Sequence, residues 1–334
     1  MKILYVYRSR KVGPSIRRVF ESIEKNISEK VDVDHVELPY IRMLDIWKNI
    51  KYIISVINKE TYDIIHITGD VYYIILPLYF IRKKDEFKIV VTVHDLGHYT
   101  QHKHTIMHFC FYWLWIRPLA LADHITFISN KSREEAENLL KLDDNKLSVV
   151  YNSYKDEYVY SPERENKKIR ILHIGTGPNK NLENVVKAIK GMSCHLRIIK
   201  KLTDSQIQLL NDCQIDYSNA YDISDEQMLE EYKQCDLVSF PSLYEGFGMP
   251  IIEAQAVGRI VVTSNREPMR SIAGNGAILV NPEDPDDIRK GFLLAIKAPQ
   301  LFIERGLENC KKYSSTYIAD QYYNVYRNLI SCSK

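Results

Sequence analysis

The sequence predicts an α/β protein with two doubly wound parallel sheets, one in each half of the chain. Short apolar runs alternate with longer amphipathic stretches in both halves, which is the rhythm of β-α-β units. The stretches between successive apolar runs are long enough for the crossover connection that parallel strands require. The length of 334 residues suits two such domains of ordinary size.

The first half of the chain contains six apolar runs of strand length. They predict strands at 2–7, 31–38, 62–67, 88–93, 124–128 and 146–151. The first run is too short for the apolar region of a signal peptide, so we interpret residues 1–8 as a strand. Residues 152–167 are polar and lose the periodicity, which indicates a linker. We therefore expect a first domain over residues 1–160.

The second half repeats the same architecture. Strands are predicted at 169–174, 195–199, 235–240, 259–263 and 277–280. A helix is expected at 181–191, and the pattern is helical from Asp287 to the end. We assign the second domain to residues 161–310. Ligands of doubly wound sheets bind outside the carboxyl ends of the strands, so the cleft between two facing domains is the expected site.

The bulk composition is that of a globular protein without a nucleic-acid-binding charge. Apolar residues make up 45% of the chain and charged residues 26%, and the net charge is +2. A strongly basic face for nucleic acid is therefore not expected. The six cysteines are scattered, without the spacing of a zinc site or a disulfide framework. We expect reduced thiols and a cytoplasmic location.

The most informative segment is 239–253, which reads Ser-Phe-Pro-Ser-Leu-Tyr-Glu-Gly-Phe-Gly-Met-Pro-Ile-Ile-Glu. An apolar strand runs through a turn rich in Gly and Pro into a helix whose first turn holds a proline. Gly246 and Gly248 have no side chains, so backbone amides at the helix start can approach an anion closely. Glu245 and Glu253 add two carboxylates for sugar hydroxyls. An ordinary strand-to-helix turn with two solvated glutamates is the alternative interpretation.

The whole string, with its second glutamate eight positions after the first, resembles the Glu-x7-Glu signature of retaining glycosyltransferases of the GT-B fold, glycosyltransferase family 4 (group 1). The resemblance implies two Rossmann-like domains facing across a cleft. It implies transfer of a hexose from a UDP- or GDP-linked sugar to a hydroxyl of a glycan or lipid-linked glycan, in cell-surface polysaccharide assembly. It also implies that the last helix, within residues 311–334, crosses back to the first domain.

The resemblance also implies roles for the residues of this segment. Glu245 is assigned to hydroxyls of the donor sugar, and Glu253 to the ribose of the nucleotide. The amides around Gly246, Phe247 and Gly248 are assigned to sugar and phosphate oxygens. Retention of the anomeric configuration would pass through an oxocarbenium-like transition state, which needs electrostatic support more than a strong base.

A second informative segment, residues 173–182, predicts a phosphate site. A strand ends at Ile174, Gly175 and Gly177 make a turn, and Lys180 stands near the start of a helix. Backbone donors, a helix N-terminus and a cation on one short segment are what a phosphate group requires. The resemblance implies that Lys180 neutralises the diphosphate and assists its departure. A surface lysine beside an Asn helix cap is the alternative.

The segment departs from the family pattern at Thr176 and Asn179, where many relatives carry a basic residue. One lysine is little positive charge for a diphosphate, so we expect a second cation nearby. Lys200 and Lys201 are the preferred candidates because they follow the end of a strand in the same sheet. Arg266 and Arg270, after the strand at 259–263, are the alternatives.

In the first domain, His94 and Asp95 stand at the carboxyl end of a predicted strand. The resemblance implies that His94, through its imidazole or its backbone carbonyl, contacts the donor sugar or its phosphate near the reacting centre. The alternative is that His94 caps a helix. His66, at the end of the predicted strand at 62–67, is a weaker candidate. In the loop after the first strand, relatives usually carry a glycine pair, whereas this chain has Gly13-Pro14, with Ser15 as the expected helix start.

We expect no metal ion and no cofactor apart from the nucleotide sugar as substrate. No Asp-x-Asp follows a strand where a metal would bridge the diphosphate, so cations and helix amides are expected to hold it. The histidines at 98, 102 and 104 have ligand-like spacing but lack a plausible carboxylate or cysteine partner.

Residues 106–122 are strongly apolar and aromatic, and two interpretations of them stay open. Arg117 and Pro118 interrupt the run, which makes it a poor membrane-spanning helix. A core helix of the first domain is the preferred interpretation. The alternative is an interfacial helix, because Trp113 and Trp115 suit a lipid headgroup region and basic side chains lie just upstream. Peripheral contact with the inner face of a membrane is therefore a possible partner interaction.

Two other function classes fit parts of the sequence. A nucleotide-sugar epimerase of related architecture would need carboxylates that activate water and would release free nucleoside diphosphate. A non-catalytic carbohydrate or membrane-surface binder could have kept the fold. A dinucleotide dehydrogenase is disfavoured, because no Gly-x-Gly-x-x-Gly follows the strand at 2–7.

Overall fold

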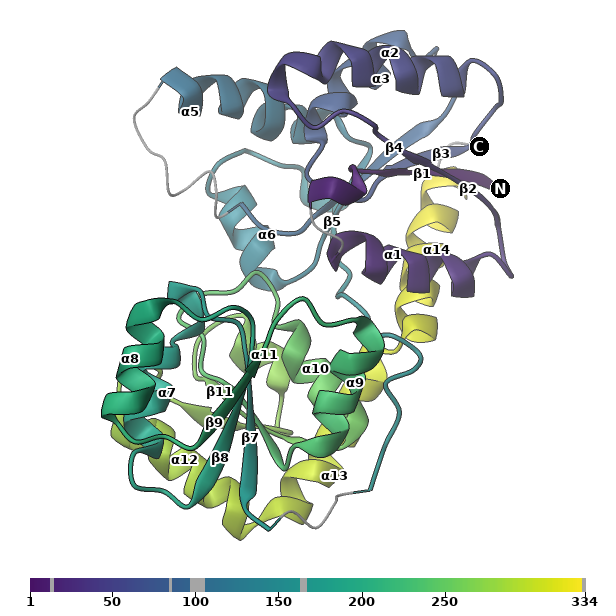
Figure 1. Cartoon of the computed structure of the whole chain (residues 1–334). Helices are drawn as coiled ribbons and strands as arrows, with labels where there is room; N and C mark the ends of the chain where they lie inside the picture. Colours follow the sequence, from purple (N-terminus) through teal and green to yellow (C-terminus); the bar gives the residue numbers. More distant parts are fainter. Residues whose placement is uncertain (13–14, 84–85, 97–105, 163–166, 332–334) are drawn as a thin grey trace. The chain divides into compact units, whose positions relative to one another are not determined.

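The computed structural model describes the chain except for residues 13–14, 84–85, 97–105, 163–166 and 332–334. The chain forms two compact units (Figure 1). The first consists of Met1–Ser153 together with Ser315–Lys334, and the second of Tyr154–Ser314. The C-terminal helix α14 (Ser315–Ser331) therefore belongs to the same unit as the N-terminal strand.

The first unit is built on a six-stranded parallel sheet in the order β2-β1-β3-β4-β5-β6. Its strands are β1 (Lys2–Tyr7), β2 (Asp32–Glu37), β3 (Ile64–Ile67), β4 (Lys88–Val93), β5 (His124–Phe127) and β6 (Leu147–Val149). The strand order reverses between β1 and β3, which is the topological switch point of a doubly wound sheet.

Helices cover both faces of this sheet because the chain leaves β1 first toward β2 and then in the opposite direction (Figure 1). On one face, α1 (Ser15–Ile27) packs against α14. On the other face, Leu4 and Val6 share one core with α2 (Ile46–Ile57), α3 (Ile75–Ile81) and the segment that begins with α5 (Ile106–Phe111). The remaining helical segments are Arg10–Val12, Met43–Asp45, Tyr72–Ile74, α6 (Asn130–Glu137) and Asp144–Lys146.

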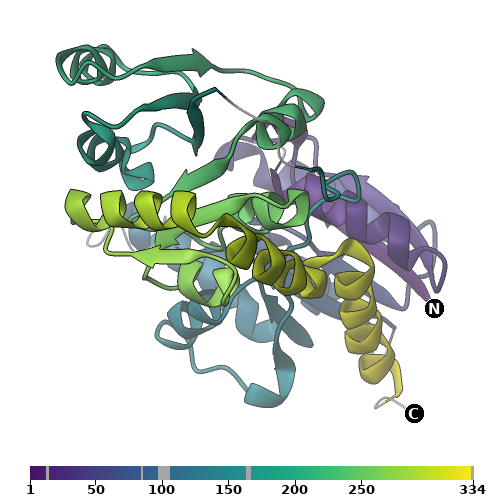
Figure 2. The same ribbon diagram turned by 90° about the horizontal axis from the view of Figure 1, so that it is seen from below.

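The second unit has a six-stranded parallel sheet in the order β12-β11-β10-β7-β8-β9. Its strands are β7 (Ile169–Ile174), β8 (Cys194–Ile199), β9 (Tyr217–Ala220), β10 (Leu237–Phe240), β11 (Ile260–Ser264) and β12 (Ile278–Val280). Its helices are η7 (Pro178–Lys180), α7 (Leu182–Ile189), α8 (Asp204–Asp212), α9 (Asp225–Gln234), α10 (Met249–Val257), α11 (Met269–Ala273), α12 (Pro285–Lys297), α13 (Pro299–Cys310) and η8 (Lys311–Tyr313). Figure 2 shows α12 and α13 following one another nearly end to end.

The predicted strands are confirmed to within two residues at either end, but β9 was missed. Its sequence, Tyr-Ser-Asn-Ala, is short and polar, and all four side chains are half-buried at the sheet edge. An edge strand of this kind carries no apolar run for a sequence pattern to detect. The predicted helix at 181–191 is the shorter α7, because Asn181 adopts a left-handed conformation and ends the preceding turn.

The aromatic segment 106–122 divides its side chains between core and surface. It continues from α5 as a π-helical turn, η4 (Tyr112–Ile116), and a 3-10 segment, η5 (Arg117–Leu121). Trp115 stacks on Phe111 with ring centroids 5.0 Å apart, and its indole Nε1 donates to the carbonyl of Asp70 over 2.8 Å. Trp113 is exposed. The core interpretation thus holds for one tryptophan and fails for the other.

Candidate functional site

The best-supported candidate site lies at the switch point of the second sheet, where the strand order reverses between β10 and β7. The two strands are parallel, with Ser239 paired to His173, so their carboxyl ends meet at one edge of the sheet. The two segments singled out from the sequence are the loops that leave these strand ends. A crevice at this position is where doubly wound sheets bind their ligands.

Gly175 allows the Lys180 side chain to lie across the end of β7. The φ angle of Gly175 is +100°, and a Cβ atom there would stand 2.6 Å from Cγ of Lys180. Any other residue would therefore both strain the backbone and displace the lysine stem. The lysine Nζ lies 4.9 Å from the centre of the Phe240 ring, at the end of the neighbouring strand.

Lys180 and Glu245 form an ion pair between the two loops. Lys180 Nζ donates to Oε1 of Glu245 over 2.5 Å, and both side chains are largely buried. The pair thus brings together the residues that the sequence assigned to the diphosphate and to the donor sugar. A charge-assisted hydrogen bond in this setting is stronger than a neutral one.

The asparagines on either side of Lys180 hold the two loops in register. The carbonyl of Asn179 accepts from the amide of Leu243 over 2.8 Å, and its side chain donates to the carbonyl of Tyr244 over 3.1 Å. Asn181 is buried, has a φ of 64°, and donates to the carbonyls of Pro241 and Pro282 over 2.9 and 2.6 Å. Sequence reasoning missed this role, although asparagine tolerates the left-handed conformation better than most residues.

Glu253 is held by a buried tyrosine. It lies in the second turn of α10, which Gly248 starts with a φ of 119°. The hydroxyl of Tyr232 donates to Oε2 of Glu253 over 2.7 Å, and burial raises the tyrosine pKa well above its ordinary value. Phe247 is buried, with its ring edge-on to Tyr313 at 6.0 Å.

The four candidates for a second cation differ in their partners. The side chains of Arg266 and Arg270 are paired with Glu283 and Glu267 over 2.9 and 2.8 Å. Lys200 and Lys201 are exposed, and no ion pair of either is recorded among the described residues. The amide of Gly175 donates to the carbonyl of Ile199, which places Lys200 level with the end of β7. These contacts favour Lys200 and Lys201.

Thr176 serves a structural purpose in the same turn. Its hydroxyl donates to the carbonyl of Lys201 over 2.8 Å, and its own carbonyl accepts from Gln206 over 2.9 Å. Thr176 thus fixes the segment that holds the two candidate lysines.

His173 lies beneath the site and was missed by sequence reasoning. It is 1% exposed, and its Nδ1 lies 3.5 Å from Oγ of Ser239. Burial, with a smaller effect from the charge of Lys180, lowers the histidine pKa to about 4. A neutral imidazole at this place adds no positive charge that would compete with Lys180.

The switch point of the first sheet carries a second polar cluster. Arg8, directly after β1, donates to both carboxylate oxygens of Asp70 over 2.9 and 3.0 Å. His94, directly after β4, is buried, and its Nε2 lies 2.8 Å from the carbonyl of Thr68. Because a carbonyl can only accept, Nε2 carries the proton, and burial lowers the His94 pKa so that the ring is neutral. Its Nδ1 is then an acceptor.

His66 is not a binding-site residue. It is fully buried between the sheet and α14, where Nδ1 contacts the hydroxyl of Tyr326 at 2.6 Å and Nε2 contacts Oγ1 of Thr92 at 2.8 Å. Burial lowers its pKa to about 3. Both ring nitrogens are thus occupied, one by Tyr326 of the last helix and the other by Thr92 of β4, so the interpretation of His66 as a weaker site candidate is wrong.

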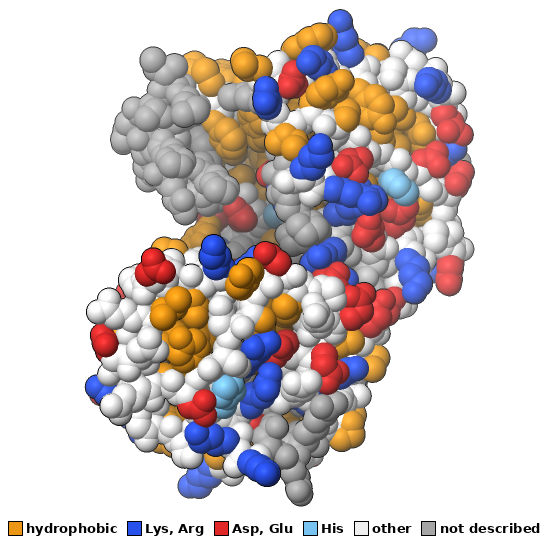
Figure 3. Space-filling view, in the orientation of Figure 1, with side chains coloured by type: hydrophobic (Ala, Val, Ile, Leu, Met, Phe, Trp, Pro, Cys, Tyr) orange, Lys and Arg blue, Asp and Glu red, His pale blue; other side chains and the backbone are white. Residues whose placement is uncertain are grey.

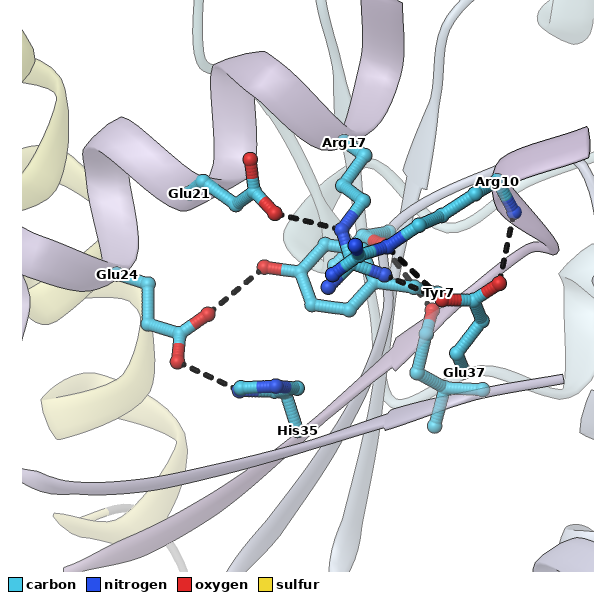
Figure 4. A network of polar contacts seen from close by, with 9 residues as sticks. Tyr7, Arg10, Arg17, Glu21, Glu24, His35 and Glu37 are labelled. Atoms are coloured by element: carbon cyan, nitrogen blue, oxygen red, sulfur yellow. Dashed lines mark hydrogen bonds and ion pairs between the residues drawn. The ribbon is translucent and has the colours of Figure 1, made fainter. Parts of the chain in front are cut away.

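Two arginines beside the first loop, Arg10 and Arg17, are paired with carboxylates (Figure 4). Arg17 lies over the Tyr7 ring and donates to Glu21 and Glu37 over 2.6 and 2.7 Å. Arg10 also pairs with Glu37, at 3.2 Å. Helix α1 begins at Ser15 as expected, whereas Gly13 and Pro14 lie outside the described residues, as do the histidines at 98, 102 and 104.

No group of three or more His, Cys, Asp or Glu side chains in the part of the chain that the structure describes could hold a metal ion. None of the described helices combines the length and apolar character needed to cross a membrane.

Two family models match consecutive parts of the chain. The model described as Glycosyltransferase Family 4 matches residues 14–158, and the one described as Glycosyl transferases group 1 matches residues 154–315. Their junction lies beside the boundary at Ser153 between the two compact units.

Curated relatives align over part of the chain. The O-antigen chain mannosyltransferase RfbU of Salmonella typhimurium is 28% identical over 216 residues, which are 62% of this chain and 59% of that protein. The O-antigen chain mannosyltransferase B of Escherichia coli is 31% identical over 110 residues, 32% of this chain and 29% of that protein. The chain thus spans less than two thirds of the length of either relative.

Solved structures match the whole fold. Anabaena HepE in complex with UDP and glucose superposes with a TM-score of 0.78 at 13% identity, covering 98% of this chain and all of that one. The lipopolysaccharide outer core galactosyltransferase WaaB superposes with a TM-score of 0.74 at 16% identity, over the full length of both. With the two family models, these matches show that the chain is a glycosyltransferase of family 4 (group 1) with the GT-B fold.

Proposed function

We propose that the protein is a retaining, metal-independent hexosyltransferase that uses a UDP- or GDP-linked sugar and acts in the cytoplasm on a glycan or lipid-linked glycan of a cell-surface polysaccharide. The observation that carries the proposal is the meeting of Lys180 and Glu245 at the switch point of the second sheet. Relatives named as O-antigen mannosyltransferases support this polymer class and favour mannose as the sugar.

Lys180 supplies the charge that a nucleoside diphosphate requires. As the bond to the sugar breaks, negative charge grows on the leaving diphosphate, and a fixed ammonium stabilises that charge. The N-terminal turn of α10 adds the positive end of a helix dipole, and the exposed Lys200 and Lys201 add further positive charge. Glu245 and Lys180 neutralise each other before the sugar nucleotide arrives, so binding exchanges their ion pair for contacts to the two halves of the ligand.

Glu253 is assigned to the ribose, and Gly246, Phe247 and Gly248 to sugar and phosphate oxygens through their backbone. The hydroxyl of Tyr232 donates to Oε2 of Glu253 and so fixes the position of the carboxylate that we assign to the ribose. We assign His94 to the donor sugar near the reacting carbon. Its neutral imidazole offers Nδ1 as an acceptor, while its carbonyl already accepts from Ser132 over 3.0 Å.

The proposal is tested by incubating the protein with UDP-, GDP-, ADP- and dTDP-linked sugars and measuring thermal shifts. A ligand present at a hundred times its dissociation constant stabilises the fold by about 2.7 kcal/mol, which a melting curve resolves. The nucleotide sugar that binds is then supplied with polysaccharide repeat-unit acceptors, and the anomeric configuration of the product is read by NMR.

We expect one nucleotide class to stabilise the protein and an α-linked sugar to be transferred from an α-linked donor. Lys180→Ala is the matched control and should remove the shift. Release of free nucleoside diphosphate without any acceptor would instead indicate an epimerase-type reaction. No shift with any of the nucleotide sugars would exclude the proposed function.

A further inference from the structure

The exposed apolar side chains of the first unit are concentrated on one layer of helices. Apart from Met1 and Tyr317, every strongly exposed large hydrophobic residue described in this unit lies in residues 40–57, 76–81 or 109–114. Leu44 is 86% exposed, Phe80 74%, Trp47 52% and Trp113 48%. We call the outward side of α2, α3, α5 and η4 the aromatic face.

The helices of the aromatic face turn their other sides to one core. Ile53 of α2, Leu78 of α3 and Ile116 of η4 are buried in the same cluster, against the same face of the sheet. The apolar residues on the outside are therefore additional to those that hold the helices in place. Figure 3 shows hydrophobic side chains, with lysine and arginine side chains among them, over the region where Figure 1 places α2 and α3.

The aromatic face carries positive charge and almost no negative charge. The segments 46–57, 75–81 and 106–121 contain no Asp or Glu, and their charged residues are Lys48, Lys51 and Arg117. Lys51 lies 4.8 Å from the centre of the Trp47 ring and Arg117 lies 5.6 Å from that of Trp113. Asp45, just before α2, is paired with Lys48 over 2.7 Å.

The opposite side of the same sheet has a different surface. Helix α1 carries Glu21, Glu24 and Lys25, and Asp320 of α14 pairs with Lys30. Charges of both signs alternate there, as on an ordinary solvated surface. The combination of exposed aromatic rings and an excess of cations over carboxylates thus distinguishes the aromatic face.

We propose that the aromatic face docks onto an anionic lipid bilayer surface. Tryptophan and tyrosine rings are favoured at the level of the lipid headgroups, where one edge is apolar and the other is wet. Lysine and arginine side chains beside them are attracted by the negative surface potential of anionic lipids. A second copy of this chain would fit the same face less well, because Lys48, Lys51 and Arg117 would meet their own counterparts.

This inference adds a partner to the proposed function without depending on it, since lipid binding is measured without sugar nucleotide or acceptor. The two can therefore fail separately. If the proposed function also holds, a transferase held at the bilayer by this face would meet lipid-linked acceptors at the surface that displays them.

Vesicle flotation tests the proposal on the full chain. The protein should float with phosphatidylcholine vesicles that contain phosphatidylglycerol, float less with phosphatidylcholine alone, and dissociate as salt screens the surface charge. The triple variant Leu44→Ser, Phe80→Ser, Trp113→Ser removes one exposed apolar side chain from each of the ranges 40–57, 76–81 and 109–114 and should abolish flotation. The double variant Lys48→Ala, Lys51→Ala should weaken binding by about fivefold per lysine.

Leu293→Ser with Leu294→Ser is the matched control, because these exposed leucines lie on α12 of the second unit. It should float like the wild type. Melting curves identify any variant that fails to fold.

The three tryptophans provide a second readout that keeps an aromatic ring at each of the three positions. Trp47 and Trp113 are exposed, whereas Trp115 is half-buried, stacked on Phe111 and packed against the core. In variants that keep one tryptophan and carry phenylalanine at the other two positions, brominated phosphatidylcholine in anionic vesicles should quench Trp47 and Trp113 and spare Trp115.

Equal quenching at all three positions, or flotation unchanged in the triple variant, would overturn the proposal. It would also be overturned if light scattering showed a dimer that the triple variant converts to monomers while neither protein floats, because the face would then join two copies of the chain.

Discussion

Glu245 and the diphosphate of the proposed donor would both pair with the ammonium group of Lys180. In the structure its ammonium pairs with Glu245, and in the proposed reaction it faces a diphosphate. Lys180→Ala should lower kcat/KM by about a hundredfold to a thousandfold, the range seen when a preorganised contact to developing charge is removed.

Lys180→Arg should restore only part of that activity, since the guanidinium is planar and broader than an ammonium. Steady-state kinetics with the identified nucleotide sugar provides the measurement. Activity of Lys180→Ala within a factor of about two of the wild type would remove the lysine from the site, because such a ratio is below 0.5 kcal/mol.

Glu245 and Glu253 should separate in their effects on two ligands. Glu245→Ala should abolish transfer and leave nucleoside diphosphate binding intact or tighter, because it removes the carboxylate that pairs with Lys180. Glu253→Ala should weaken the nucleoside diphosphate and the nucleotide sugar equally, since the ribose is common to both. Isothermal titration with each ligand measures this difference.

Tyr232→Phe is the matched control for Glu253, because it removes the hydrogen bond to the carboxylate and keeps the ring in the core. Tyr232→Phe should weaken the binding of both ligands by the same factor, and that factor should be smaller than the one for Glu253→Ala. The assignments of the two glutamates would be reversed if Glu253→Ala alone discriminated between the ligands.

From the sequence we could predict which residues form the candidate site, but we could not predict most of the contacts that hold those residues in place. Glycines, a lysine and two glutamates at fixed spacing mark the two loops, because each residue type has a specific chemical use there. The contacts of Asn181, Tyr232 and His173 join residues far apart along the chain. Such contacts depend on which strands become neighbours in the sheet, and short motifs do not encode that order.

At the level of elements, helix α14 is docked by buried hydroxyl groups as well as by apolar packing. Tyr322 and Tyr326 are fully buried and contact Thr92 and His66, at 3.1 and 2.6 Å. The hydroxyls of Tyr5 and Tyr326 lie 3.1 Å apart. The sequence predicted that this segment is helical. It did not predict the buried hydrogen bonds that dock the helix, because tyrosines and a histidine in a strand are equally common at a surface.

The docking of α14 predicts a dependence of stability on pH. Burial lowers the pKa of His66 from 6.5 to about 3, so the unfolded chain binds this proton more readily than the folded one. Stability is therefore fully present above about pH 6.5 and is lost as the pH falls toward the folded pKa. At pH 5 the loss from a group shifted this far is about 2 kcal/mol.

Urea unfolding at pH 7 and pH 5 measures this effect, with His66→Gln as the comparison. His173 and His124 are shifted in the same direction, to about 4 each, so the variant should keep part of the pH dependence. We expect the wild type to lose more stability than His66→Gln between the two pH values. Equal losses in the two proteins would show that His66 is not the group responsible.

For the whole molecule, the order of strands in each sheet explains where the chemistry is found. Both sheets reverse their strand order once, and in both the polar clusters follow strands that flank the reversal or lie next to one that does. Alternating apolar and amphipathic segments were enough to predict two such sheets. The sequence indicated only the part of the aromatic face that lies in residues 106–122. The exposed apolar residues of α2 and α3 form no short motif, so their contribution was not predicted.

The source of positive charge at the site gives the last prediction. If Lys180, the N-terminal turn of α10 and the exposed Lys200 and Lys201 hold the diphosphate, transfer should continue unchanged in EDTA. Lys200→Ala with Lys201→Ala should then lower kcat/KM by about tenfold or more, as expected for lost contacts to a charged group. Arg266→Ala with Arg270→Ala is the matched control, because those arginines are already paired with glutamates. Loss of transfer in EDTA, restored by Mg²⁺ or Mn²⁺, would instead assign the charge compensation to a metal ion and leave the two lysines without that role.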